Sequence, residues 1–226
     1  MSHISHLKNN LSSNKMKNFV IIYLAALLFQ SCTSDNKTTL PILGNRQAVE
    51  KQVDGKTVVD TVYQTIPAFS LTNQDSLVVT EKTFDGKIYV ADFFFTSCTS
   101  ICPIMHRNML KIYTKYLDNK EVKFISHSID TKYDTPSRLK RYADKLGVKG
   151  NQWEFVQGSY EAIFNQAAKS YLVTAFQDVK EPQGLVHDGY FLLVDKQKRM
   201  RGAYDGTKND QVEKLMKDMD ILLQEK

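Results

Sequence analysis

The feature that most constrains the fold of this chain is an apolar run that leads directly into two cysteines. Ile88 to Phe95 is apolar except for Asp92, which is typical of a central strand covered on both faces. Cys98 and Cys102 follow at once, and Pro103 suits a first helical position because the N–H that proline lacks would have no partner there. The sequence therefore predicts a strand, a sharp turn holding two thiols, and a helix whose positive end favours a thiolate at Cys102.

Strand and helix patterns alternate along the rest of the chain, which indicates a sheet with parallel strands and helices on its faces. Two short runs, 69–71 and 77–79, are separated by turn residues and predict a hairpin near the start of the domain. We therefore expect an α/β fold, a thioredoxin-like mixed sheet flanked by helices, with an N-terminal β-hairpin extension. Further predicted strands cover 122–129, 153–156, 190–194 and 200–204, and predicted helices cover 105–117, 136–146, 160–171 and 208–223.

The first 31 residues are typical of a targeting segment. Lys15 and Lys17 precede an apolar run of eleven residues, Phe19 to Phe29, which fits a signal peptide and is too short to span a bilayer. Met16 lies directly on the charged flank and is a more natural start than Met1. The sequence predicts export, with the domain in the periplasm or at the cell surface.

Residues 27–33 resemble a bacterial lipoprotein box, in which Cys32 becomes the lipid-bearing N-terminus, although Phe29 stands where leucine is commonest. A free secreted form is the alternative. Residues 32–57 are rich in polar residues and predict a flexible tether, which leaves 58–226 as the folded domain. Without the targeting segment, the chain has 27 basic and 25 acidic residues, and it has no basic stripe interleaved with aromatics, so we expect no nucleic-acid partner.

Once Cys32 is assigned to lipid, Cys98 and Cys102 are the only thiols of the exported domain. A disulfide between them would close a very small loop and add little stability. The two cysteines are therefore better explained as a functional thiol pair than as a structural disulfide. A metal site needs a third group, and three histidines fall within the domain. His106 lies one helical turn after Cys102 but is otherwise an ordinary helix residue near the surface, and His127 fits a half-buried strand position.

His187 differs because it lies in a segment between Gly184 and Gly189, directly before a predicted strand. In a thioredoxin-like fold this segment faces the loop that carries the cysteines. Two thiolates and an imidazole form a soft donor set that selects Cu(I), whereas a structural zinc ion usually takes four ligands and no fourth is obvious here.

These residues fall in four stretches that resemble the Sco (SenC) family of copper-binding, thioredoxin-like assembly factors for cytochrome c oxidase. The similarity covers about residues 62–224. Thr131 replaces a usual proline of the family, and Val186 and Asp188 flank the histidine where the family commonly has Asp before it and Ser or Thr after it. The four stretches are residues 94–103, which resemble the last ten positions of F-x-F-T-x-C-x-x-x-C-P, residues 128–136, which resemble S-x-D-P-x-x-D-T-P, and residues 153–158 and 186–195.

The resemblance implies that Cys98, Cys102 and His187 bind copper, as Cu(I) or Cu(II), with the dithiol form required for loading. It implies a metallochaperone, tethered to the membrane by lipid, that delivers copper to the copper-bearing subunit of cytochrome c oxidase or to another copper protein. A thiol-disulfide reductase partner would keep the two cysteines reduced. Asp130, at a predicted strand end near the site, could orient the metal-binding loop of a partner, whereas Asp134 fits turn and helix-cap chemistry before Pro136.

Other functions stay open on the sequence alone. The two thiols also fit a thiol-disulfide oxidoreductase that reduces the cysteines of the oxidase copper site, although the spacer is one residue longer than in C-x-x-C proteins. A redox or copper sensor that signals to a partner protein is a further function that stays open. A peroxiredoxin-like peroxidase is disfavoured because no proline precedes Cys98 at the expected distance.

Overall fold

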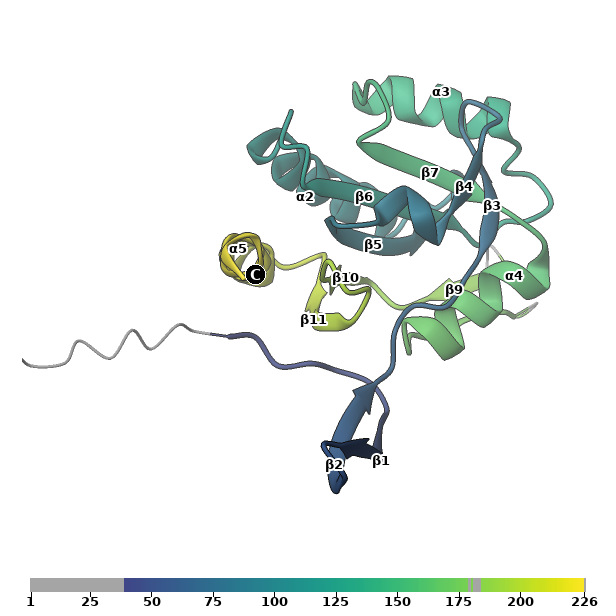
Figure 1. Cartoon of the computed structure of the whole chain (residues 1–226). Coiled ribbons are helices and arrows are strands. Elements are labelled where there is room, and N and C mark those ends of the chain that lie inside the picture. Colours follow the sequence, from purple (N-terminus) through teal and green to yellow (C-terminus); the bar gives the residue numbers. More distant parts are fainter. Residues whose placement is uncertain (1–38, 179, 181–183, 226) are drawn as a thin grey trace, which may run out of the picture. The chain divides into compact units, whose positions relative to one another are not determined.

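The computed structural model describes residues 39–178, 180 and 184–225 (Figure 1). The predicted targeting segment, Cys32 and the first part of the predicted tether lie outside the described residues. Within the described part of the chain, no helix is both long enough and apolar enough to cross a membrane.

The centre of the domain is a mixed sheet of seven strands. β5 pairs in parallel with β6, and β6 with β7, while the remaining neighbours in the sheet are antiparallel. Every residue of β5 and β6 is buried, as expected of central strands covered on both faces. In spatial order the strands are β11 (Met200–Asp205), β10 (Tyr190–Val194), β5 (Ile88–Phe94), β6 (Val122–Ser128), β7 (Trp153–Gln157), β3 (Ser70–Asn73) and β4 (Val78–Thr80).

Helices cover both faces of this sheet, which gives three layers. α2 (Cys102–Lys115), α3 (Pro136–Leu146) and α5 (Asn209–Gln224) lie on one face, where Phe94 contacts His106 and Tyr142. α4 (Tyr160–Asn165) and the single π-helical turn η2 (Gln166–Ser170) lie on the other, where Tyr171 packs against Phe93. Successive residues of β5 point to opposite faces, so Asp92 points to the α2 side with Phe94.

These elements confirm the predicted fold class, a mixed α/β sheet flanked by helices. β3 and β4 form the hairpin expected from 69–71 and 77–79, and a short 3₁₀ helix, η1 (Glu81–Phe84), leads on to β5. The segment predicted as one helix over 160–171 is instead α4 followed by η2, and the chain leaves it through Leu172, which has a positive φ of 55°.

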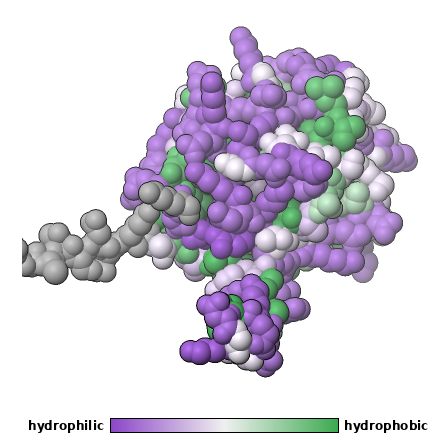
Figure 2. Space-filling model, in the orientation of Figure 1, coloured by the Kyte–Doolittle hydropathy of each residue, from purple (hydrophilic) through white to green (hydrophobic). Residues whose placement is uncertain are grey.

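A second hairpin, β1 (Arg46–Val53) and β2 (Lys56–Tyr63), is separate from the seven-stranded sheet. β1 and the start of β2 fall inside residues 32–57, which the sequence predicts to be a flexible tether. Apart from Tyr63, every residue of the two strands is exposed. The alternation over residues 58–63 marks the start of folded sequence within β2, whereas β1 has no core-facing apolar pattern that would reveal it. Figure 2 shows the hairpin as a mixture of hydrophobic and hydrophilic residues.

Candidate metal centre

The two cysteines lie where β5 gives way to α2. After β5 the backbone turns, and the Cys98 N–H donates to the Phe95 carbonyl at 3.1 Å. α2 then begins at Cys102, with Pro103 in its first turn, as the sequence predicts. Both cysteines are buried and carry free thiols. The sharp turn therefore presents two sulfurs on one side of the carboxyl end of β5.

His187 reaches these sulfurs from a different element than the sequence predicts. It is the last residue of β9 (Leu185–His187), which forms a small hairpin with β8 (Ala175–Gln177), so a strand holds it in place of the loop that was expected. Its Nε2 lies 3.3 Å from the Cys102 Sγ. Its Nδ1–H donates to the backbone carbonyl of Asp188 at 3.0 Å, which leaves Nε2 as the nitrogen that can bind a metal.

The donor atoms of Cys98, Cys102 and His187 all lie within 4.8 Å of one another. Two sulfurs and one imidazole nitrogen make a soft donor set, which suits Cu(I) and leaves a coordination position open for transfer. Among the residues that the structure describes, no fourth His, Cys, Asp or Glu joins this group, so a closed four-ligand zinc site does not form from them.

The two thiols differ in their protonation. Interaction with the Cys102 thiol lowers the pKa of Cys98 to about 3, and the contacts of Cys98 with His187 and Ser100 act in the same direction. The same interaction, together with burial, raises the pKa of Cys102 far above its usual value. The sequence predicts the thiolate at Cys102, but the hydrogen bond to Cys98 and burial of the Cys102 sulfur oppose the helix dipole there, so the negative charge of the pair favours Cys98.

A buried carboxylate holds the cysteine turn in position. Asp134 accepts hydrogen bonds from the Thr96 N–H at 2.9 Å and from the Ser128 hydroxyl at 2.6 Å. It also accepts from the Thr96 hydroxyl, and the Arg138 guanidinium lies 3.4 Å away. Helix α3 has no side-chain cap, so the expected cap role for Asp134 was wrong. The carboxylate instead joins the β6–α3 loop to the turn before Cys98.

The other acidic candidates bind backbone. Asp130 is buried and accepts the Tyr133 N–H at 3.0 Å, which is turn chemistry. The Asp188 carboxylate accepts the Thr174 N–H at 2.7 Å and does not contact the imidazole beside it in sequence. Asp188 therefore ties the segment after η2 to the end of β9, and its influence on His187 runs through its own backbone carbonyl.

His106 and His127 lie away from the sulfurs. His106 is fully buried, not near the surface as expected, and its two nitrogens meet the Asp92 carboxylate at 3.1 Å and the Tyr142 hydroxyl at 2.7 Å. Asp92 also accepts from Ser126. The sequence does not predict this buried cluster around His106 and Asp92. Its one signal in the sequence is Asp92 itself, a carboxylate inside an apolar strand.

His127 is also fully buried, on the opposite face of the sheet, and stacks on Phe93 with ring centroids 4.8 Å apart. Burial lowers its pKa to about 4, so the ring is neutral near pH 7. Both histidines are therefore core residues, and His187 is the histidine that meets the thiols.

The fold and the site together define a thioredoxin-like domain with a Cys-Cys-His group at the carboxyl end of a central strand. A family model described as SCO1/SenC matches residues 59–224, and the chain belongs to this family.

Three solved structures illustrate the relationship. A SCO1/SenC family lipoprotein from Bacillus anthracis is 30% identical, with a TM-score of 0.65 over 71% of this chain and 96% of that chain. BsSco, a cytochrome c oxidase assembly protein of the Sco family with a disulfide switch, is 28% identical, with a TM-score of 0.63 over 72% of this chain and 95% of that one. Arabidopsis thaliana ScoI with copper bound, 23% identical, shares the fold with a TM-score of 0.57 over 68% of this chain and 97% of that one.

Proposed function

We propose that this chain is a copper metallochaperone that binds one copper ion through Cys98, Cys102 and His187 and delivers it for assembly of the copper site of cytochrome c oxidase. The observation that carries the proposal is the convergence of these three donors within 4.8 Å, from elements 85 residues apart in sequence. Copper is the cargo, and the reduced pair is the form that accepts it. The copper-bound and oxidase-assembly descriptions of the relatives support the choice of cargo and recipient.

Binding requires few changes in the chain. The lowered pKa of Cys98 favours its thiolate, and Cys102 loses its proton to solvent when its sulfur takes the metal in place of the hydrogen bond to Cys98. The imidazole is fixed with Nε2 toward the sulfurs by the bond from Nδ1 to the Asp188 carbonyl. Three donors leave a position through which an incoming ligand of the recipient protein can displace them one by one.

The test is copper binding by the reduced full chain. We expect one copper per chain, with X-ray absorption showing two sulfur ligands and one nitrogen ligand. His187→Ala should weaken binding by more than about 100-fold, since loss of a ligand exceeds the 10–100-fold effect of losing its outer-shell partner. His127→Phe removes a buried imidazole elsewhere and is the matched control. Unchanged affinity in His187→Ala would refute the three-donor site.

A second candidate function is reduction of disulfides in the recipient protein. The low pKa of Cys98, with Cys102 as a proton-bearing neighbour, favours it, and BsSco is described with a disulfide switch. The Cys98 thiolate would attack one sulfur of the target disulfide and release a thiolate. Cys102, after losing its proton, would then attack Cys98, so the target dithiol is reduced and this pair is oxidised. A separate thiol reductase would restore the pair.

The two functions separate in one experiment. If copper-free protein reduces the cysteines of the oxidase subunit in a single turnover, and Cys102→Ser traps a mixed disulfide, the reductase function holds. If transfer of copper to an already reduced subunit depends on all three donors, the chaperone function holds.

We further propose that Cys32 carries lipid and tethers the domain to the outer side of a membrane. The support is the lipoprotein-like box around this residue and the description of the Bacillus anthracis relative as a lipoprotein. Mass spectrometry of membrane-bound protein should find a lipid-modified Cys32 as the first residue, and Cys32→Ala should release the protein from the membrane. Membrane retention of Cys32→Ala in processed form would refute the tether.

A further inference from the structure

A cavity of about 460 Å³ lies at the end of the sheet opposite the metal centre, beside the first residues of β5 and β6. Four of its lining residues are lysines, and they come from three separate segments of the chain. Asp118 is its one acidic lining residue. The lysines are Lys87, Lys120, Lys123 and Lys149.

The charge of the four lysines is only partly compensated by Asp118 and by the carboxylates nearby. The Lys123 ammonium lies 3.4 Å from the Glu154 carboxylate, but Lys87 donates only to the backbone carbonyl of Lys120, at 2.7 Å. Across the described part of the chain, Lys87, Lys120 and Lys149 form no ion pair with a carboxylate. Three lysines around one hollow favour an anion with several acceptor oxygens, which is the chemistry of a phosphate group.

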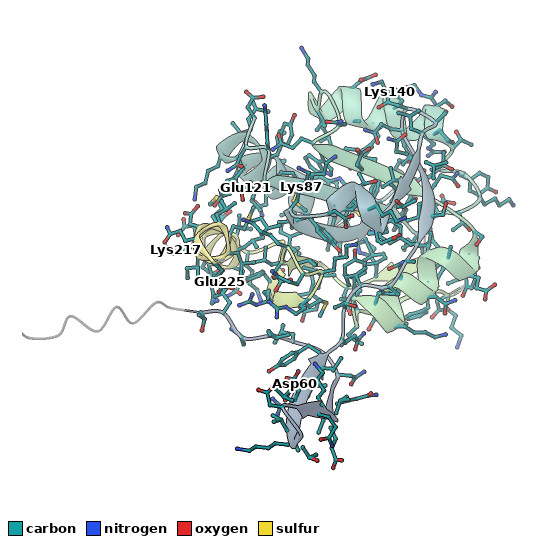
Figure 3. All side chains as sticks on the ribbon, in the orientation of Figure 1. Asp60, Lys87, Glu121, Lys140, Lys217 and Glu225 are labelled. Atoms are coloured by element: carbon teal, nitrogen blue, oxygen red, sulfur yellow. The ribbon has the colours of Figure 1, made fainter. Side chains whose placement is uncertain are left out.

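The acidic residue next to the cavity, Glu121, interacts with Lys87 and offsets only part of this charge. The Glu121 carboxylate is bound by the Lys196 ammonium, which comes from the turn between β10 and β11. This pair connects the cavity edge to the β10–β11 turn, and Figure 3 shows Lys87 and Glu121 close together beside the sheet.

The chain enters the domain at the same end of the sheet. The Arg201 guanidinium donates to the backbone carbonyls of Leu40 and Pro41, and the Leu43 N–H donates to the Met200 carbonyl. Met200 pairs with Val194, which in turn pairs with Tyr89 at the start of β5. The entry point and the lysine cavity therefore share the end where β5 begins.

The metal centre follows the other end of that strand. The seven residues of β5 separate the two ends by about 20 Å, at about 3.3 Å per residue. From Cys32 to Leu40 there are eight residues, which span at most about 28 Å when fully extended. A lipid on Cys32 would thus keep the entry end of the domain near the membrane surface, and the lysine cavity with it.

We propose that the lysine cavity binds the phosphate of an anionic lipid headgroup, so that the entry end of the domain rests on the membrane and the metal centre faces away from it. The proposal rests on the tether of the proposed function. Its consequence is a fixed orientation, in which Cys98 and His187 are presented to the part of a recipient that stands outside the bilayer.

The test uses the full chain anchored in vesicles, with amide hydrogen exchange as the readout. In vesicles of equal parts phosphatidylglycerol and phosphatidylcholine, amides of residues 117–123 and 149–152 should exchange several-fold more slowly than in pure phosphatidylcholine. Lys120→Glu with Lys149→Glu should abolish the difference, since each lysine near an anionic surface contributes roughly fivefold to binding. Lys56→Glu with Lys169→Glu makes the same change of charge away from the cavity and should keep the protection.

Each other outcome overturns the proposal. Equal exchange in the two kinds of vesicle, or equal loss in both double variants, would mean that the cavity makes no specific headgroup contact. Protection of the same amides by inorganic phosphate in pure phosphatidylcholine vesicles would show a free-phosphate site in place of a lipid contact. Lys120→Gln with Lys149→Gln avoids introduced repulsion and should lose part of the protection, so full protection in this variant would also overturn the proposal. Mass spectrometry of Cys32 in the same samples reports on the lipid tether and copper stoichiometry reports on the metal centre, so a missing headgroup contact is distinguishable from failure of the proposed function.

Discussion

Replacement of Asp134 by alanine should destabilise the protein more than any single surface change, although Asp134 lies outside the metal-binding group. Its fully buried carboxylate accepts bonds from the Thr96 N–H and the Ser128 hydroxyl. Hydrogen bonds to charged groups contribute about 1.5–3 kcal/mol each, so leaving both donors unpaired should cost about 3–6 kcal/mol. For a domain of this size each kcal/mol lowers Tm by about 2–4 °C, so a cost near 4 kcal/mol gives a drop of about 8–16 °C.

The assay is thermal unfolding of the reduced, metal-free chain, followed by circular dichroism. Asp144→Ala, which removes an exposed carboxylate 3.7 Å from Lys140, is the matched control and should change stability by less than about 0.5 kcal/mol. Copper affinity should fall in Asp134→Ala as well, because Thr96 begins the turn that sets Cys98. A melting temperature within about 2 °C of the unchanged protein would refute the reasoning, since the buried donors would then have found other partners.

Three further predictions concern single groups. In the unchanged protein the pKa of His127 is about 4 when folded and 6.5 when unfolded, so the unfolded chain gains the proton first and the free energy of unfolding falls by about 3 kcal/mol as pH falls through that window. His127→Phe should remove this loss and so make stability less dependent on pH on the acid side. Alkylation of the metal-free protein by iodoacetamide should occur at Cys98, at a rate that is flat between about pH 5 and pH 8, because the thiolate is already formed. Arg201→Met should cost about 3 kcal/mol because it removes the buried arginine that pairs with both Asp195 and Glu225, and it should speed protease cleavage where the chain enters the domain.

Each of these has its own control and contrary result. If the stability of His127→Phe falls with pH as steeply as that of the unchanged protein, the acid sensitivity arises from another residue. A rate that rises tenfold per pH unit would mean that Cys98 is a thiol, and Cys98→Ser should remove the reaction entirely. Arg199→Met takes a more exposed arginine from the same carboxylate, and equal destabilisation by both variants would contradict the importance of burial.

The strand and helix pattern of the core could be predicted from the sequence because its elements are long enough to show periodicity. α3 and β10 have the bounds that the pattern predicts. Pro136 begins α3 and Gly147 ends it, and a continuous apolar run defines β10. β8 and β9 were missed because strands of three residues carry no alternation to detect, whereas the equally short β4 was found from the turn residues that separate it from β3. β1 was missed because its exposed residues have no buried face to mark.

The candidate site was only partly predictable for a related reason. The turn that holds the two cysteines is local, so spacing and Pro103 suffice to place it. The partners that position it are not local: Asp134 reaches Thr96 across 38 residues, and Asp92 on β5 meets His106 on α2, the helix that covers that face of the sheet. A sequence indicates that a carboxylate is present in a strand or loop, but packing decides which donors surround it.

The geometry of the thiol pair makes copper loading and disulfide exchange compete for the same atoms. In the reduced state the sulfurs and the imidazole stand within 4.8 Å, spaced for a metal between them. A disulfide requires the two sulfurs to close to about 2.05 Å, which removes both thiolates from the donor set and leaves His187 alone. Oxidised protein therefore cannot hold copper at this site, and metal bound to Cys98 blocks its attack on a target disulfide. If both functions operate, they must follow one another, with reduction of the pair as the step that commits the protein to carrying metal.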